Sequence, residues 1–151
     1  MKKLIALLAV SIISVSLAQA AEVKIEAAIA VDKDTKPATT FGADVPKLYA
    51  FFRSKGTAKG DKLRGVWIAE NVGDAAPENT KIDEATLTAD EADFFGAFSI
   101  TKPTKGWPPG KYRVEIYSGD DLATTAKFTI NAAKSDKKDS EDESKDASSD
   151  E

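Results

Sequence analysis

The sequence predicts an all-β domain, folded as a two-sheet sandwich of about seven strands. The clearest evidence is a predicted hairpin at residues 106–130, GWPPGKYRVEIYSGDDLATTAKFTI, with a proline-glycine turn, a strand, an acidic loop and a second strand. Tyr112, Val114 and Ile116 alternate with charged residues, and strand side chains point alternately to opposite faces. One face of this hairpin is therefore buried, and it needs further strands to cover it.

The other strands are predicted in chain order from short apolar or alternating runs bounded by turn residues. They span residues 23–31, 47–53, 63–69, 80–88 and 94–100, with a polar, proline-containing loop after the first. In the last strand of the hairpin, the residues expected to share the buried face are Leu122, Thr124, Ala126, Phe128 and Ile130. No run has sustained helical spacing, and short strands at this spacing indicate a sandwich or barrel.

Two residues favour an immunoglobulin-like sandwich. Trp67 lies in the third predicted strand, where that fold buries a tryptophan, and Tyr112 lies where a tyrosine corner would form. Val114 occupies the position of the usual second cysteine, and the chain has no cysteine. The predicted fold is therefore an immunoglobulin-like sandwich without a disulfide.

The same segments resemble small secreted bacterial immunoglobulin-like β-sandwich modules, over residues 23–130. The motifs that carry the resemblance are Thr40-Phe41, YAFF at 49–52, GVWI at 65–68, TKP at 101–103 and residues 106–112. They describe turns and core positions. The resemblance implies the fold and a binding or accessory role, and it brings no catalytic residue with it.

Three segments differ in composition. Residues 1–20 have a Lys-Lys start, an apolar run and Ala-Gln-Ala at the end, the pattern of a cleaved secretory signal peptide of bacterial type. Residues 21–133 form the predicted domain. Residues 134–151 contain no apolar side chain larger than alanine and predict a disordered acidic tail. We expect a periplasmic or secreted protein, with no membrane insertion after signal cleavage.

Charge and composition exclude several classes of function. The predicted domain carries 15 basic and 17 acidic side chains, so it has no basic footprint for nucleic acid. The chain has no histidine and no cysteine, which excludes imidazole or thiolate metal sites and histidine-based nucleophile pairs. We therefore predict no enzyme activity, no catalytic residue, no cofactor and no metal site.

Carboxylates leave two less favoured alternatives open. A small hydrolase could use loop carboxylates such as Asp93 and Asp120, although each lies in a predicted loop where a solvated turn is the simpler explanation. Calcium could bind at Asp32 and Asp34 or at Asp120-Asp121, but none of these loops has the EF-hand pattern. Solvated turns between strands explain the same residues.

Four aromatic residues are the candidate contacts for a ligand or partner. Tyr49 and Phe51 alternate with Leu48, Ala50 and Phe52, and should therefore face away from the core. Tyr117 and Trp107 could join them in a platform for a sugar or an apolar patch for a protein. The structural alternative is that Trp107 pins its proline turn and the tyrosines cover the sheet edge.

The function predicted from the sequence is that of an exported, non-enzymatic binding or accessory module. Its expected partner is another protein of the cell envelope or the medium, with carbohydrate as the alternative ligand. An exposed strand edge would offer a second route to a partner, because its backbone groups are unpaired.

Overall fold

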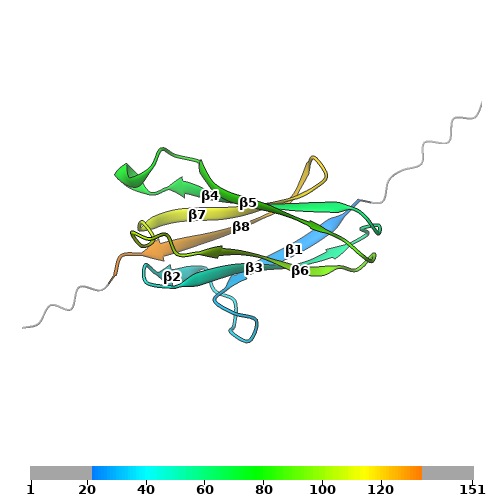
Figure 1. Ribbon diagram of the computed structural model, residues 1–151, viewed down its shortest axis with the longest axis horizontal. Helices are drawn as coiled ribbons and strands as arrows, with labels where there is room; N and C mark the ends of the chain where they lie inside the picture. Colours follow the sequence, from blue (N-terminus) through cyan, green and yellow to red (C-terminus); the bar gives the residue numbers. More distant parts are fainter. Residues whose placement is uncertain (1–21, 134–151) are drawn as a thin grey trace, which may run out of the picture.

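The computed structural model describes residues 22–133, which fold into two packed β-sheets (Figure 1). The predicted signal peptide and acidic tail lie outside the described residues. One short 3-10 turn, η1, spans Gly73–Ala75, and within residues 22–133 no helix is long and apolar enough to cross a membrane. The strands are β1 Lys24–Ala30, β2 Thr40–Gly42, β3 Lys47–Lys55, β4 Lys62–Asn71, β5 Thr80–Thr88, β6 Phe95–Thr101, β7 Gly110–Ser118 and β8 Asp121–Asn131.

The strand order is that of an immunoglobulin-like sandwich. A three-stranded sheet has the order β1-β3-β6, and a five-stranded sheet has the order β2-β8-β7-β4-β5. Every pair is antiparallel except β2 with β8, which run parallel. All seven predicted strands are present, so the predicted all-β class is confirmed.

Strand β2 lies in a segment that the sequence predicts as a loop. Its three residues are too short to show the alternation that predicts a strand. It forms only because the end of β8 runs beside it, with Thr40 opposite Thr129 and Gly42 opposite Asn131. This pairing is a tertiary contact, and local sequence does not encode it.

The two predicted landmarks of the fold are confirmed. The Trp67 side chain on β4 is 2% exposed and meets the Phe128 ring edge-on, with 6.1 Å between centroids. The Tyr112 hydroxyl donates a hydrogen bond to the backbone carbonyl of Pro108, which is the tyrosine corner. Burial raises the pKa of Tyr112 to about 12. Val114, at the position of the usual cysteine, is fully buried, so packing replaces the disulfide.

The register of the β7–β8 hairpin contains a bulge that the sequence analysis missed. Ile116 lies opposite Thr124, but the next pair is Tyr117 with Leu122, so β8 has one extra residue at this point. An extra residue moves all later side chains to the other face. The prediction that Leu122 shares the buried face is therefore wrong, and this side chain is 53% exposed.

Candidate functional site

Strand β3 is the centre of the three-stranded sheet and places two of the candidate residues on its outer face. Leu48, Ala50 and Phe52 are almost fully buried against the other sheet. Tyr49 and Phe51 alternate with them and lie on the opposite face, half-buried. The sequence analysis predicted this orientation, and the structure confirms it.

Tyr49 and Phe51 form a stacked set with a third residue, Phe95 on β6. The centroids of the Tyr49 and Phe51 rings are 5.5 Å apart with an interplanar angle of 19°. The Phe51 and Phe95 rings are 6.2 Å apart at 13°. We call Tyr49, Phe51 and Phe95 the aromatic column. Phe95 is 62% exposed, one of the most exposed large apolar side chains of the described chain.

Sequence reasoning did not single out Phe95. It lies beside Phe94, and two adjacent phenylalanines do not tell which one faces the core. The signal was available further along the strand, because Phe98 and Ile100 are apolar at alternate positions and are both buried. By alternation, Phe94 lies on the same face as Phe98 and Ile100 and points toward the core, where its ring centroid is 6.0 Å from that of Phe52. Phe95 therefore points outward.

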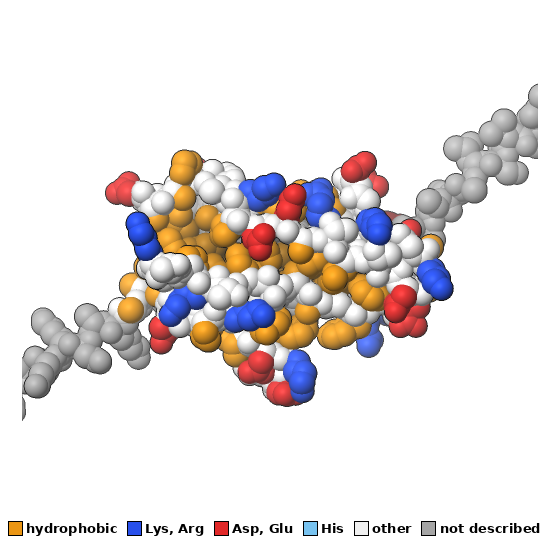
Figure 2. Space-filling model, viewed as in Figure 1, with side chains coloured by type: hydrophobic (Ala, Val, Ile, Leu, Met, Phe, Trp, Pro, Cys, Tyr) orange, Lys and Arg blue, Asp and Glu red, His pale blue; other side chains and the backbone are white. Residues whose placement is uncertain are grey.

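Small side chains flank the aromatic column on both neighbouring strands. Ala28 on β1 and Ala97 on β6 lie opposite Phe51, and Ser99 lies opposite Tyr49. None of them rises as far from the sheet as a ring does. Phe95 is the exposed end of the column. Hydrophobic side chains are visible along the lower margin of the molecule, on the side of the three-stranded sheet (Figure 2).

Charged residues border the column at both ends, and most are basic. The Lys47 ammonium lies 5.0 Å from the centroid of the Tyr49 ring, as in a cation–π contact. Arg53 lies opposite Phe95. By alternation the same face carries five charged side chains, Lys24, Lys47, Arg53, Lys55 and the single carboxylate Glu26. An acidic protein thus presents a basic border around its exposed aromatic rings.

The third candidate, Tyr117, lies on the outer face of the other sheet. Its hydroxyl donates a 2.6 Å hydrogen bond to Glu115, and its ring lies 4.3 Å from the Arg64 guanidinium carbon. Burial acts to raise the pKa of Glu115, but hydrogen bonds from Tyr117 and Arg113 outweigh it and hold this pKa below its usual value. The bond to Glu115 also raises the pKa of Tyr117.

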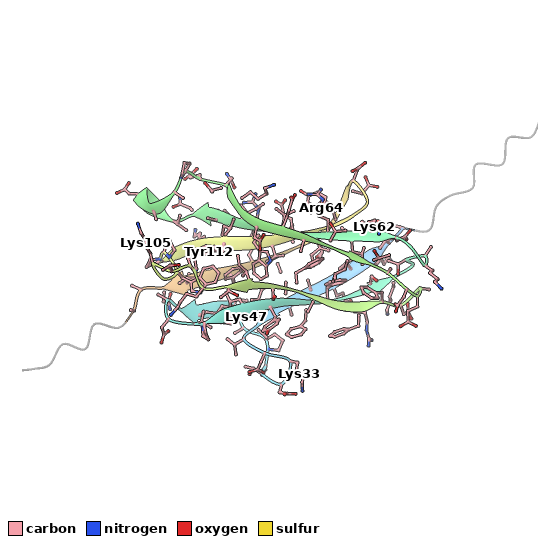
Figure 3. All side chains as sticks on the ribbon, in the orientation of Figure 1. Lys33, Lys47, Lys62, Arg64, Lys105 and Tyr112 are labelled. Atoms are coloured by element: carbon pink, nitrogen blue, oxygen red, sulfur yellow. The ribbon has the colours of Figure 1, made fainter. Side chains whose placement is uncertain are left out.

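Tyr117 is therefore part of a polar network rather than of an apolar patch. Arg64 and Lys47, which mark the two faces, lie on opposite sides of the sandwich (Figure 3). The structure brings Tyr49 and Phe51 together but does not bring Tyr117 to them.

The fourth candidate, Trp107, lies in the core. Its side chain is 3% exposed, its indole N–H donates a 2.9 Å hydrogen bond to the Val45 carbonyl, and its ring meets the Tyr112 ring edge-on. The expectation that Trp107 contributes to a surface platform is therefore wrong, because its side chain is buried. The turn before β7 folds back over the end of the core and carries the indole inward.

The carboxylates considered for calcium or catalysis are solvated. Asp32 accepts hydrogen bonds from the backbone of Asp34 and Thr35, at 2.8 and 2.7 Å, and bonding with Thr35 and Asp34 lowers the pKa of Asp32. Asp93 and Asp120 are exposed. In the described part of the chain, no three Asp, Glu, His or Cys residues are grouped closely enough to hold a metal ion.

The comparisons with known proteins concern the fold. No model of a known protein family matches the chain, and no curated protein is significantly similar to it. An immunoglobulin-like protein from Pseudomonas aeruginosa is 19% identical with a TM-score of 0.48, and the match covers 75% of this chain and 99% of that one.

Two larger proteins contain a similar domain. An alkylpurine DNA glycosylase from Pseudomonas fluorescens is 18% identical (TM-score 0.47), and the match covers 74% of this chain and 31% of the glycosylase. A β-glucosidase from Listeria innocua is 10% identical (TM-score 0.48), with 74% of this chain and 16% of the enzyme covered. We transfer no activity or functional residue from these likenesses.

Proposed function

We propose that this protein is an exported, non-enzymatic module that binds another protein of the cell envelope or the medium. The binding surface is the outer face of the three-stranded sheet. The observation that carries the proposal is the aromatic column, three stacked rings that end in a phenylalanine with 62% of its surface exposed. Aromatic anchors inside a polar border are the usual composition of a protein interface.

The stacked arrangement favours a rigid apolar contact. Each ring is supported by the next, so little conformational freedom is lost when a partner covers them. Burying a large apolar side chain such as Phe95 contributes about 1.5–3 kcal/mol. The flanking Ala28, Ala97 and Ser99 leave room for partner side chains beside the rings.

The same arrangement argues against the alternative ligand, carbohydrate. A sugar binds by stacking on the face of an aromatic ring. Tyr49 and Phe95 both stack on the Phe51 ring, so the faces of this ring are already occupied. Tyr49 has Phe51 on one side and the Lys47 ammonium over its ring. Phe95 is the one ring of the column with a face that neither another ring of the column nor the Lys47 ammonium covers. A single free face fits the side of an apolar partner better than a chain of sugar rings.

Export is part of the proposal because of the predicted signal peptide at residues 1–20. An exported module meets its partner in the envelope or the medium. The basic border further implies that the partner is acidic around its apolar contact, since opposite charges steer association.

A cross-linking pull-down with surface variants tests the proposal. The tagged protein is expressed in its host as the wild type and as Phe51→Ser, Phe95→Ser and Leu122→Ser. Leu122 is the matched control, because it is similarly exposed but lies on the outer face of the other sheet. Circular dichroism confirms that each variant is folded.

We expect one exported protein to be recovered with the wild type and with Leu122→Ser. Its recovery should fall about tenfold or more in both phenylalanine variants, as for anchor residues of an interface. Equal recovery in all four proteins would contradict the proposed binding face. Binding of the wild type to a glycan array, with loss in Phe95→Ser, would replace protein by carbohydrate as the ligand.

A further inference from the structure

The two sheets have four edges, and one of them lacks the features that keep strand edges from pairing. The edge strands are β1 and β6 in one sheet and β2 and β5 in the other. Natural edges are blunted by charges, prolines, shortness or coverage. β2 has three residues, and β5 carries Lys81, Asp83 and Glu84. β1 carries Lys24 and Glu26, and the loop after it bonds its edge through the Ala38 N–H and the Ile29 carbonyl.

Strand β6 has none of these protections. It reads FGAFSIT, without a charge or a proline, over seven residues. Within residues 22–133 it pairs only with β3. This free edge belongs to the strand that carries Phe95, and the other two rings of the aromatic column lie on the neighbouring strand, β3.

The hydrogen bonds at both ends of β6 show which backbone groups are free. The Ser54 N–H bonds to the Phe94 carbonyl, and the Lys102 N–H bonds to the Pro46 carbonyl. Even-numbered residues of β6 therefore point their backbone groups toward β3, because such pairs recur at every second residue of an antiparallel ladder. Phe95, Ala97, Ser99 and Thr101 point theirs toward the free edge.

These same four residues have their side chains on the outer face of the sheet. A strand added antiparallel to β6 would exchange hydrogen bonds with them and place every second side chain on that face. Residues opposite Ala97 and Ser99 would lie beside these small side chains, in the rows of Phe51 and Tyr49. Residues opposite Phe95 and Thr101 would lie in the rows of Arg53 and Lys47.

We propose that the free edge of β6 accepts an extended segment of the partner by antiparallel strand addition. The segment carries apolar side chains at two alternate positions and a carboxylate two residues beyond each of them. Backbone hydrogen bonds supply affinity, and the alternate side chains supply specificity. This inference rests on the proposed function and names the mode of binding and the chemistry of the partner.

Synthetic peptides test the mode of binding. The probe is the blocked peptide Glu-Thr-Val-Thr-Val-Thr-Glu, in which the glutamates and valines are the residues that face β6. One derivative is N-methylated on both valines, which removes the N–H groups aimed at β6. Its matched control is N-methylated on the two threonines that precede the valines, whose N–H groups point away from β6. A third peptide has lysine in place of both glutamates.

We expect the probe to slow amide exchange at Ala97 and Ser99 of the purified protein by about tenfold or more. The valine-methylated peptide should bind at least about tenfold more weakly than the threonine-methylated one, because it loses backbone hydrogen bonds. The lysine peptide should also bind more weakly. Ala97→Pro removes an N–H that points to the free edge and makes no bond to β3, so the variant should fold, because edge strands tolerate such a proline. Its affinity for the probe should fall by a similar factor.

Equal affinity of the two methylated peptides overturns strand addition, and so does the absence of protection at Ala97 and Ser99 at millimolar probe. These results need no protein variant. The two proposals fail separately. If Phe51→Ser loses the partner but the two methylated peptides bind with equal affinity, the proposed function stands and strand addition is refuted. If Phe51→Ser recovers the partner as well as the wild type does and the peptides behave as expected, strand addition stands and the proposed partner-binding face is refuted.

Discussion

Trp107→Ala is expected to lower the free energy of unfolding by about 3–5 kcal/mol, as for other buried tryptophans. The indole is 3% exposed, and its removal would leave a cavity against Tyr112 and an unsatisfied Val45 carbonyl. Because domains are stable by only about 5–15 kcal/mol, this loss is a large share of the total. Urea unfolding followed by the fluorescence of Trp67 measures it.

A second variant separates packing from hydrogen bonding at this position, and a variant at another position serves as a comparison. Trp107→Phe keeps much of the ring volume and loses the bond to the Val45 carbonyl, so it should cost less than the alanine variant, about 1–3 kcal/mol. Tyr117→Phe, in the part-buried network on the outer face of the other sheet, should lower stability by about 0.5–1.5 kcal/mol, the usual net contribution of one hydrogen bond. A Trp107→Ala protein within 1 kcal/mol of the wild type would refute the buried role of the indole.

Gly65→Ala is expected to destabilise the sandwich by about 1–3 kcal/mol through overpacking, and Gly65→Val by more. A methyl group on Gly65 would lie 2.5 Å from ring carbons of Phe98, which crosses from the opposite sheet. Glycine is thus required on β4 for the two sheets to approach each other at this point. Thermal and urea unfolding measure the loss.

A double-mutant cycle assigns this cost to the inter-sheet contact. Phe98→Leu shortens the side chain that the new methyl group meets, so the double variant Gly65→Ala, Phe98→Leu should be more stable than the sum of the single changes predicts. Strictly additive losses would show that the cost of Gly65→Ala arises elsewhere, for example from a change in the backbone of β4.

The strands were predictable where alternation is strong. Residues 47–53 show why, since Leu48, Ala50 and Phe52 must share a face whatever the rest of the fold does. That alternation also placed Tyr49 and Phe51 on the surface, which is the part of the candidate site that the sequence predicted correctly. The tyrosine corner was predictable for a similar reason, because it depends on a local turn next to Tyr112.

The errors occur where long-range contacts decide the position. Trp107 lies in a turn, where alternation has no meaning, and its inward position depends on Val45, which is distant in the chain. Leu122 follows a bulge that appears only in the pairing of β8 with β7. Phe95 joined the site because β6 lies beside β3, a pairing that crosses two strands of the other sheet in chain order.

The charge distribution supports the same interpretation of the site. The chain as a whole is acidic, with a formal charge of −4, yet the outer face of the three-stranded sheet carries four basic side chains and one carboxylate. Ion pairs on the other outer face, such as Arg113 with Glu115 at 2.8 Å, are satisfied within the protein. The basic side chains that border the aromatic column take part in none of the ion pairs found within residues 22–133, so they are available to a partner.

The most direct test of the binding face is site-specific photo-cross-linking in the host. Benzoylphenylalanine is placed at Thr101, on the outer face of the three-stranded sheet, and in a second protein at Thr125, on the outer face of the other sheet. Both positions are exposed. We predict that Thr101 cross-links one exported protein and that Thr125 does not. Cross-linking of that protein from Thr125 alone, or equally from both positions, would contradict the proposed face.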